Sequence, residues 1–203
     1  MKIAAIILAG GEGRRMGHIN KAHLTFGGER FIDRQLRTVA DWADERIVVV
    51  NGSERAAELD LPSDVRVVAD HYAGEGPLAG LQAGLEAASS PYAWVIGCDQ
   101  PLLDAEAAKL LLSRLEDGDC EAALPVIEGR PQPLHAVYRQ EVGAIASRLL
   151  AAGQRRLMAL VEEITWIGVE EETFGARGIA RAFAADVDTP EQYEKLTVTK
   201  EQR

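Results

Sequence analysis

The apolar residues of this 203-residue chain fall into short continuous runs separated by stretches with helical spacing. The first run, Ile3 to Leu8, has the unbroken apolar character of a strand that is buried on both faces. Later runs of the same kind lie at 46–50, 65–69, 93–97 and 122–126. In the segment that follows the first run, apolar positions recur at the helical period and include one polar residue: Phe31, Ile32, Gln35, Leu36 and Val39.

Strands that alternate with helical segments predict an α/β fold: three α/β/α layers around a mostly parallel, Rossmann-like sheet. The length suits a single domain with a full core. We therefore expect one domain over residues 1–196, followed by a polar tail over residues 197–203. Thr189 and Pro190 have the residue types of a helix cap and a first helical position.

The stretch after the first strand is rich in glycine and cations. Gly10, Gly11 and Gly13 leave backbone N–H groups uncovered, and Arg14, Arg15 and Lys21 follow. A bare backbone next to three cations predicts a polyphosphate site, whereas the simpler alternative is a strand-to-helix turn with solvated arginines. A P-loop is excluded because Gly17 is followed by His18 and not by Lys-Ser/Thr. The dinucleotide-binding fingerprint is excluded because three residues, not two, separate Gly13 from Gly17.

Polar residues follow several predicted strands at the point where each strand ends. Asn51 and Asp70 lie at two such ends, Leu8 to Gly10 at a third, and Asp99 follows the run 93–97. In parallel sheets these ends share one edge, where ligands bind, so a common crevice is expected. Asp99 suits a hard cation held against phosphate oxygens, and the alternative is a turn residue that caps the following backbone.

Composition narrows the classes of partner. The formal charge of −10 argues against nucleic acid and against an anionic membrane surface. Two cysteines, Cys98 and Cys120, are too few for a disulfide framework and lack metal-ligand spacing, which favours a reducing cytoplasm. Cys98 is interpreted as a small buried apolar residue rather than a nucleophile. No stretch approaches the ~20 apolar residues that a membrane span requires.

Several motifs together resemble a known superfamily. Leu8-Ala9-Gly10-Gly11, Arg15-Met16-Gly17 and Lys21 match the signature of nucleotidyltransferases that activate sugars, isoprenoid precursors and the molybdenum-binding pterin. The chain most resembles the molybdenum cofactor guanylyltransferases, from Leu8 to about Tyr193. Four further segments carry that resemblance: 76–80 (GPLAG), 98–101 (CDQP), 133–139 (PLHAVYR) and 153–158 (GQRRLM).

The resemblance implies a reaction and a set of roles. The phosphate of molybdopterin would attack the α-phosphorus of GTP, and pyrophosphate would leave. Asp99 would hold Mg²⁺, with Arg15 and Lys21 on the triphosphate. The nucleoside would lie against the Leu8, Ala9 and Gly10 backbone, Asn51 and Asp70, and the pterin phosphate against Arg155 and Arg156. Transient contacts with proteins that deliver the pterin or receive the product are compatible with this scheme.

Two departures from the family pattern keep alternatives open. Asn20 precedes Lys21 where the family usually has Asp, and the late motif reads Asp186-Val187-Asp188-Thr189-Pro190 where the family usually has asparagines. Either aspartate would help to bind Mg²⁺ if it faces the crevice, or it would be a surface or capping group. The alternatives are a cytidylyltransferase acting on the same pterin and a non-catalytic nucleotide-binding module.

Overall fold

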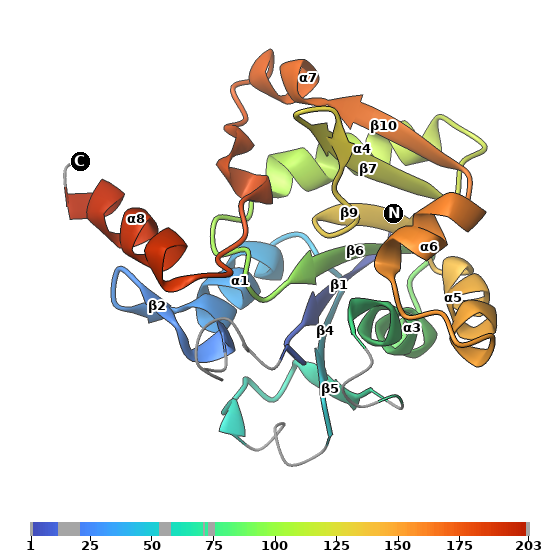
Figure 1. The fold of residues 1–203 in the computed structure, drawn as a ribbon, viewed down its shortest axis with the longest axis horizontal. Helices are drawn as coiled ribbons and strands as arrows, with labels where there is room; N and C mark the ends of the chain where they lie inside the picture. Colours follow the sequence, from blue (N-terminus) through green and yellow to red (C-terminus); the bar gives the residue numbers. More distant parts are fainter. Residues whose placement is uncertain (1, 12–20, 53–57, 71, 73–75, 202–203) are drawn as a thin grey trace.

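The computed structural model of the chain describes residues 2–11, 21–52, 58–70, 72 and 76–201. Its centre is an eight-stranded sheet, flanked by helices on both faces (Figure 1). The strands of this sheet are β1 (Ile3–Leu8), β4 (Glu45–Val50), β5 (Arg66–Ala69), β6 (Tyr92–Gly97), β7 (Ala122–Ile127), β8 (Arg130–Pro131), β9 (Ala136–Arg139) and β10 (Trp166–Glu170).

The helical segments and a small second sheet complete the fold. A two-stranded antiparallel sheet pairs β2 (Thr25–Phe26) with β3 (Glu29–Arg30). The helices, with η marking 3-10 turns, are η2 (Lys21–His23), α1 (Phe31–Ala40), α3 (Pro77–Ala87), α4 (Ala105–Glu116), α5 (Val142–Ala151), α6 (Leu157–Glu163), α7 (Glu171–Gly175), η3 (Arg181–Ala184) and α8 (Pro190–Glu201). Within the described residues, none of these helices combines the length and the apolar character needed to cross a membrane.

The strand order is β10-β7-β9-β6-β1-β4-β5, with β8 paired to β7. The pairs β6–β1, β1–β4, β4–β5 and β10–β7 are parallel, and β9 runs antiparallel to both of its neighbours. This confirms the predicted α/β class and the mostly parallel sheet. From β5 the chain returns through α3 to the other side of β1, so the order reverses between β1 and β6. Ligands bind at such switch points, outside the carboxyl ends of the strands.

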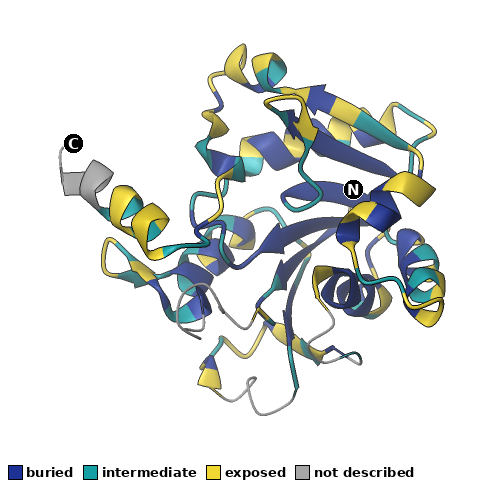
Figure 2. Ribbon diagram, in the orientation of Figure 1, coloured by how far each residue is buried: buried dark blue, intermediate teal, exposed yellow. Residues whose placement is uncertain are grey.

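The alternation of side chains along β1 divides the core into two layers. Ile3, Ala5 and Ile7 face one layer, which contains residues of α1 and α4, whereas Ala4 and Ile6 face the other, which contains residues of α3, α5 and α6. Figure 2 shows the central strands as buried and the outer sides of the helices as exposed. The apolar runs of β1, β4, β6 and β7 are therefore explained by burial on both faces of the sheet. The expectation of a buried strand at 65–69 is wrong, because β5 is the edge strand of the sheet and most of its residues are at least partly exposed.

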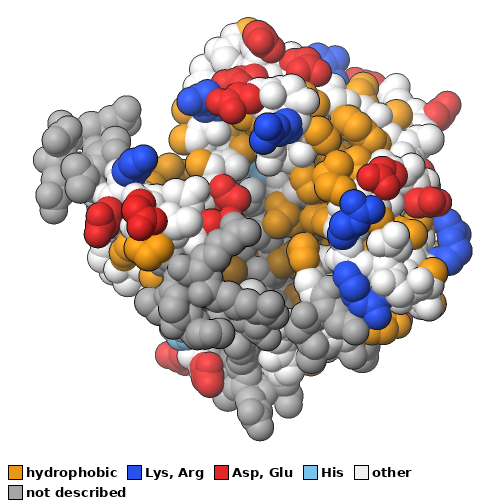
Figure 3. Space-filling view, viewed as in Figure 1, with side chains coloured by type: hydrophobic (Ala, Val, Ile, Leu, Met, Phe, Trp, Pro, Cys, Tyr) orange, Lys and Arg blue, Asp and Glu red, His pale blue; other side chains and the backbone are white. Residues whose placement is uncertain are grey.

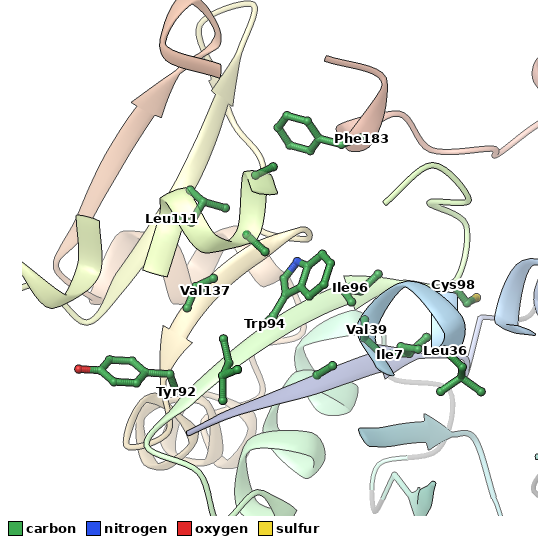
Figure 4. Packing of buried hydrophobic residues seen from close by; sticks show 14 of the residues in the cluster. Ile7, Leu36, Val39, Tyr92, Trp94, Ile96, Cys98, Leu111, Val137 and Phe183 are labelled. Atoms are coloured by element: carbon green, nitrogen blue, oxygen red, sulfur yellow. The ribbon is translucent and has the colours of Figure 1, made fainter. Parts of the chain in front are cut away.

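Helix α1 packs directly beside the carboxyl ends of the central strands. Leu36 and Val39 of α1 lie close to Ile7 of β1 and Ile96 of β6, and Cys98 is at the adjacent end of β6 (Figure 4). Burial raises the pKa of the Cys98 thiol well above its usual range, so the thiol stays protonated. These features agree with the interpretation of Cys98 as a small apolar residue.

Helix α8 and the β2–β3 hairpin lie together on one side of the molecule (Figure 1). The Tyr193 hydroxyl donates to the Thr25 carbonyl oxygen at 2.7 Å, and the Tyr193 ring lies 6.2 Å from that of Phe31. The Thr189 hydroxyl accepts from the Gln192 N–H at the start of α8, as expected for a helix cap. Helix α8 runs across position 196, so the tail predicted over residues 197–203 begins inside this helix.

Candidate active site

Asp99 lies in a tight turn at the carboxyl end of β6, next to the switch point of the sheet. The turn is closed by the Gln100 N–H, which donates to the Gly97 carbonyl oxygen at 3.1 Å. A Cβ atom on Gly97 would lie 2.4 Å from Asp99 Oδ1, so the carboxylate folds back over a position that only glycine leaves open. The absence of a side chain at Gly97 is thus a condition for the orientation of Asp99.

Lys21 and Asp188 come from distant parts of the chain and meet Asp99 at this turn. The Lys21 Nζ atom is 3.1 Å from Asp99 Oδ2 and also donates to Asp188 Oδ1. The side chains of Lys21, Asp99 and Asp188 are 10%, 24% and 31% exposed, so the contact is partly shielded from water. Asp188 therefore points toward the Asp99 turn, which the sequence had left undecided.

The three groups carry an excess of negative charge. Burial raises the pKa of Asp99; Lys21 opposes this effect, but Asp188 and Asp186 add to it, so the pKa remains above its usual value. Burial would lower the pKa of Lys21, but Asp99 and Asp188 outweigh burial and raise it. Lys21 therefore stays protonated at neutral pH, while the ionised form of Asp99 is disfavoured. A further cation at this site would relieve the repulsion between the carboxylates.

The arrangement fits a magnesium ion that shares its coordination with a substrate. In the described part of the chain, no group of three or more His, Cys, Asp or Glu side chains has the arrangement of a complete metal site. Mg²⁺ is commonly bound by one or two carboxylates, with substrate phosphates and water as its other ligands. Asp99 and Asp188, which already converge on one ammonium group, supply such a pair of oxygen donors.

The end of β1 lies against the end of β4 at the same edge of the sheet. The Ala9 N–H donates to the Val49 carbonyl oxygen at 2.8 Å. A Cβ atom on Gly10 would lie 2.4 Å from Asn51 Oδ1, so glycine permits this close approach. The structure thus brings Ala9, Gly10 and Asn51 together, as the sequence predicted, and Leu8 lies beside them with its side chain against Gly80.

Asp70 extends this edge at the end of β5. It is buried, and its Oδ1 atom accepts from the Tyr72 N–H at 2.6 Å, which is the capping geometry of an Asp in a turn. The Arg155 guanidinium lies over the Tyr72 ring at 5.8 Å and donates to the Leu150 and Gln154 carbonyl oxygens. Arg155 is therefore on the Asp70 side of the crevice.

The remaining predicted site residues are Arg156 and Arg15. Arg156 is exposed and directly precedes α6. Arg15 lies outside the described residues, as do Arg14 and the rest of the segment 12–20. The roles assigned to these arginines stay predictions.

Helix α3 begins at the same edge of the sheet and runs back along β1. Gly80 in its first turns lies against Leu8, whereas Gly84, one turn later, lies against Ile6. Because α3 runs opposite to β1, its N-terminus is beyond Leu8, on the side of the crevice. Its first turn contains no acidic residue. The positive end of the α3 dipole therefore favours an anion there.

Figure 3 shows hydrophobic side chains exposed together in the middle of this face, with acidic groups and Lys and Arg at their margins. Leu134 is partly buried and lies beside the Asp99 turn, since its Cδ1 atom would be 3.2 Å from a Cβ on Gly97.

Two buried polar residues have surroundings that no sequence motif indicated. His135 directly precedes β9 with φ = 64° and is fully buried. Its ring packs between Trp94 and Phe183, with centroid distances of 5.0 and 4.6 Å, and burial lowers its pKa to about 3. Gln35, which stood among apolar helix positions, is a buried donor to the Asp99 turn. A polar residue in an apolar stripe was the only sequence signal for its role.

A model of the MobA-like NTP transferase domain matches residues 5–166 of the chain. A protein of Bacillus cytotoxicus, named "Probable molybdenum cofactor guanylyltransferase", is 32% identical and covers 98% of both chains. A "Molybdenum cofactor guanylyltransferase" of Burkholderia ambifaria is 34% identical over 77% of this chain and 80% of its own length. A crystal structure of molybdopterin-guanine dinucleotide biosynthesis protein A from Archaeoglobus fulgidus has a similar fold, with a TM-score of 0.86, 21% identity, and coverage of 98% of this chain and 100% of that chain.

Proposed function

The chain belongs to the MobA-like NTP transferase family. On this basis, we propose that it transfers GMP from GTP to the phosphate of molybdopterin. The products are pyrophosphate and molybdopterin guanine dinucleotide. The likeness to relatives named molybdenum cofactor guanylyltransferase, which spans 98% of both chains for that of Bacillus cytotoxicus, supports this acceptor and this nucleotide.

One observation carries the proposal: Lys21, Asp99 and Asp188 converge beside the switch point of the sheet. An aspartate that only capped a turn would not require a lysine ammonium group and a second carboxylate beside it. Two carboxylates with one buried cation form a site whose charge is incomplete without a further cation. A triphosphate with its bound metal ion supplies both that cation and the anionic groups that Lys21 can bind.

The proposed reaction is an in-line displacement at phosphorus. An oxygen of the pterin phosphate forms a bond to the α-phosphorus of GTP, and the bond between that phosphorus and the oxygen leading to the β-phosphate breaks. Pyrophosphate leaves with the electron pair of the broken bond. A phosphate monoester is largely dianionic at neutral pH, so the nucleophile requires no general base. This agrees with the protonated thiol of Cys98 and the buried, neutral ring of His135.

Catalysis in this scheme consists of alignment and neutralisation of charge. Asp99 and Asp188 would hold Mg²⁺, which, when bound, neutralises charge on the phosphate oxygens. Lys21 would bind the triphosphate together with Arg15. The edge formed by Leu8, Ala9, Gly10, Asn51 and Asp70 would hold the nucleoside. The two arginines before α6, Arg155 and Arg156, would bind the pterin phosphate.

The experiment that tests the proposal measures pyrophosphate. The protein is incubated with molybdopterin, Mg²⁺ and one of GTP, CTP, ATP or UTP. We expect release with GTP that depends on both molybdopterin and Mg²⁺. Release that is faster with CTP would favour the cytidylyltransferase, and nucleotide binding without release would favour the non-catalytic module.

A further inference from the structure

Helix α1 carries a buried glutamine on the side that packs against the sheet. Gln35 is 0% exposed, and its neighbours along the buried stripe of the helix are Ile32, Leu36 and Val39. Burying an amide among apolar side chains costs free energy unless its polar atoms form hydrogen bonds. The position of Gln35 therefore calls for a specific partner.

The partners of Gln35 are two carbonyl groups on either side of Asp99. The Nε2 atom donates to the Gly97 carbonyl oxygen at 2.8 Å and to the Gln100 carbonyl oxygen at 2.9 Å. Gln35 Oε1 has no hydrogen-bond partner among the described residues. The opposite orientation of the amide would point Oε1 at two carbonyl oxygens, so the contact fixes which end of the amide faces the turn. Gln35 thus acts here as a double donor.

Other hydrogen bonds hold the same turn. The Gly97 N–H donates to Gln100 Oε1 at 3.0 Å, and the Val187 N–H donates to the Asp99 carbonyl oxygen at 2.9 Å. The neighbouring residue on α1, Arg34, donates through Nε to the Pro101 carbonyl oxygen at 2.9 Å. The carbonyl groups of residues 97, 99, 100 and 101 therefore all accept hydrogen bonds, and α1 supplies the donors for three of them.

The position of the Asp99 carboxylate depends on this backbone. Its Oδ1 atom lies 2.4 Å from where a Cβ on Gly97 would be, and its Oδ2 atom accepts from Lys21. A shift of the Gly97 or Gln100 carbonyl would move the carboxylate relative to Lys21. We propose that Gln35 is a positioning residue: its amide fixes the turn at residues 97–100 so that Asp99 meets the cation and phosphate site in one orientation. This inference rests on the proposed role of Asp99.

The test compares Gln35→Met with Gln82→Met. Methionine keeps the length of the side chain and removes the donor. Gln82 is a matched control because it is also buried on a helix, with Nε2 donating to Glu86 and Ser147 and Oε1 unpartnered among the described residues. Its partners lie in α3 and α5, away from the Asp99 turn.

Three readouts are measured for both variants. The first is the Mg²⁺ concentration that gives half-maximal pyrophosphate release. The second is the affinity for Mn²⁺ in the presence of GTP, measured by electron paramagnetic resonance. The third is hydrogen exchange of the Gly97, Gln100 and Val187 amides, whose hydrogen bonds belong to the turn. Denaturant unfolding gives the change in global stability for each variant.

For Gln35→Met we expect the Mg²⁺ concentration for half-maximal release to rise about 10-fold or more, because small misplacements of groups in a reactive site lower the rate strongly. The affinity for Mn²⁺ should fall by a similar factor. The three turn amides should exchange faster than in the wild-type protein. Gln82→Met should leave all three near the wild-type values. If Gln35→Met lowers only global stability, as Gln82→Met does, the inference is wrong and Gln35 is a packing residue.

Two features keep the inference falsifiable under other outcomes. If Gln35→Met fails to fold, hydrogen exchange of the wild-type protein tests the inference instead. The inference requires the amides of Gly97, Gln100 and Val187 to be as protected from exchange as those of the core strands. Rapid exchange of these three amides would overturn it. If the wild-type protein releases no pyrophosphate, the proposed function fails, while the Mn²⁺ and exchange readouts still test Gln35.

Discussion

The amino and carboxyl edges of the parallel part of the sheet carry charged residues that are arranged in opposite ways. At the amino ends of β4 and β5, five charged residues and Ile47 line a hollow of about 320 Å³: Asp44, Glu45, Arg46, Asp64 and Arg66. At the carboxyl ends lie Lys21, Asp99 and Asp188.

At the amino ends, charged groups pair with backbone groups or with each other. Arg46 forms an ion pair with Asp64, and Arg66 donates to the Ala87 carbonyl oxygen at 2.6 Å. Glu45 accepts from the Ser89 N–H at 3.0 Å and from the Ser90 hydroxyl. Burial would raise the pKa of Glu45, but these hydrogen bonds and the charge of Arg66 outweigh burial and lower it. The protein groups at this end therefore stabilise the ionised form of Glu45 without a ligand.

At the carboxyl ends the balance is reversed. The pKa of Asp99 is raised by burial and by two further carboxylates, and Lys21 compensates only in part. The folded protein therefore disfavours the ionised form of Asp99 but stabilises that of Glu45. The two carboxylates thus differ in what surrounds them, and groups with a pKa perturbed like that of Asp99 are typical of functional sites.

The largest effect is expected at the carboxyl ends of the strands, from a change at Asp99. Asp99→Asn should lower the rate of pyrophosphate release on the order of 10²-fold or more, by analogy with the loss of other groups that stabilise charge in the transition state. Because ionised Asp99 is disfavoured in the fold, thermal stability should be unchanged or higher. Steady-state kinetics and a melting curve check both parts. Near-normal turnover would show that Asp99 does not contribute to the proposed site.

Lys21→Ala should weaken GTP binding about 10-fold or more and GMP binding less, because GMP lacks the β- and γ-phosphates. Calorimetric titration with each nucleotide in the presence of Mg²⁺ measures the difference. Equal weakening for both nucleotides would mean that Lys21 serves only to neutralise Asp99 and Asp188.

Asp188→Asn tests whether the second carboxylate contributes to the cation site. We expect the Mg²⁺ concentration for half-maximal rate to rise several-fold, since an amide oxygen is a weaker ligand for a hard cation than a carboxylate. The Mg²⁺ dependence of pyrophosphate release gives this value. An unchanged Mg²⁺ titration would leave Asp188 as a partner of Lys21 alone.

The smallest effect on activity is expected at the amino ends of the strands. Glu45→Gln should change the rate less than about 2-fold and lower the free energy of unfolding by about 1 kcal/mol, because hydrogen bonds to a partly exposed charge are lost. Since the pKa of Glu45 is lower in the folded protein, this stabilisation is present above the unfolded pKa and is lost as the pH falls through the folded pKa.

Urea unfolding of wild type and Glu45→Gln at several pH values measures this dependence. The difference in stability between the two proteins should be largest near neutral pH and should disappear in acid. A difference that grows in acid would contradict the assignment, as would a large loss of activity in Glu45→Gln.

The sheet and the gathering of polar residues at its carboxyl edge were predictable because their determinants are local. Apolar runs marked most of the buried strands, and Gly10, Asn51, Asp70 and Asp99 were each recognised as lying at or just beyond the end of a strand. The rule that parallel strands end at one edge then placed them together. The apolar periodicity and this rule were sufficient to place these residues at one edge of the sheet.

The remaining parts of the site depend on contacts between distant segments. Asp188 lies 167 residues from Lys21, and nothing local to it indicates whether it caps α8 or faces the crevice. Gln35 is 62 residues from Gly97, and its only signal was polarity in an apolar stripe. His135 directly precedes a strand, but its positive φ and the packing of its ring between Trp94 and Phe183 had no signal in the local pattern.

The most direct test of the proposed reaction follows the phosphorus atoms of the nucleotide. The protein is incubated with molybdopterin, Mg²⁺ and GTP that is radiolabelled on either the α- or the γ-phosphate, and the products are separated by chromatography. Transfer of GMP predicts that the α-label appears in a pterin dinucleotide and the γ-label in pyrophosphate, in equal amounts. A γ-label recovered as free phosphate, or an α-label that never joins the pterin, would contradict the account.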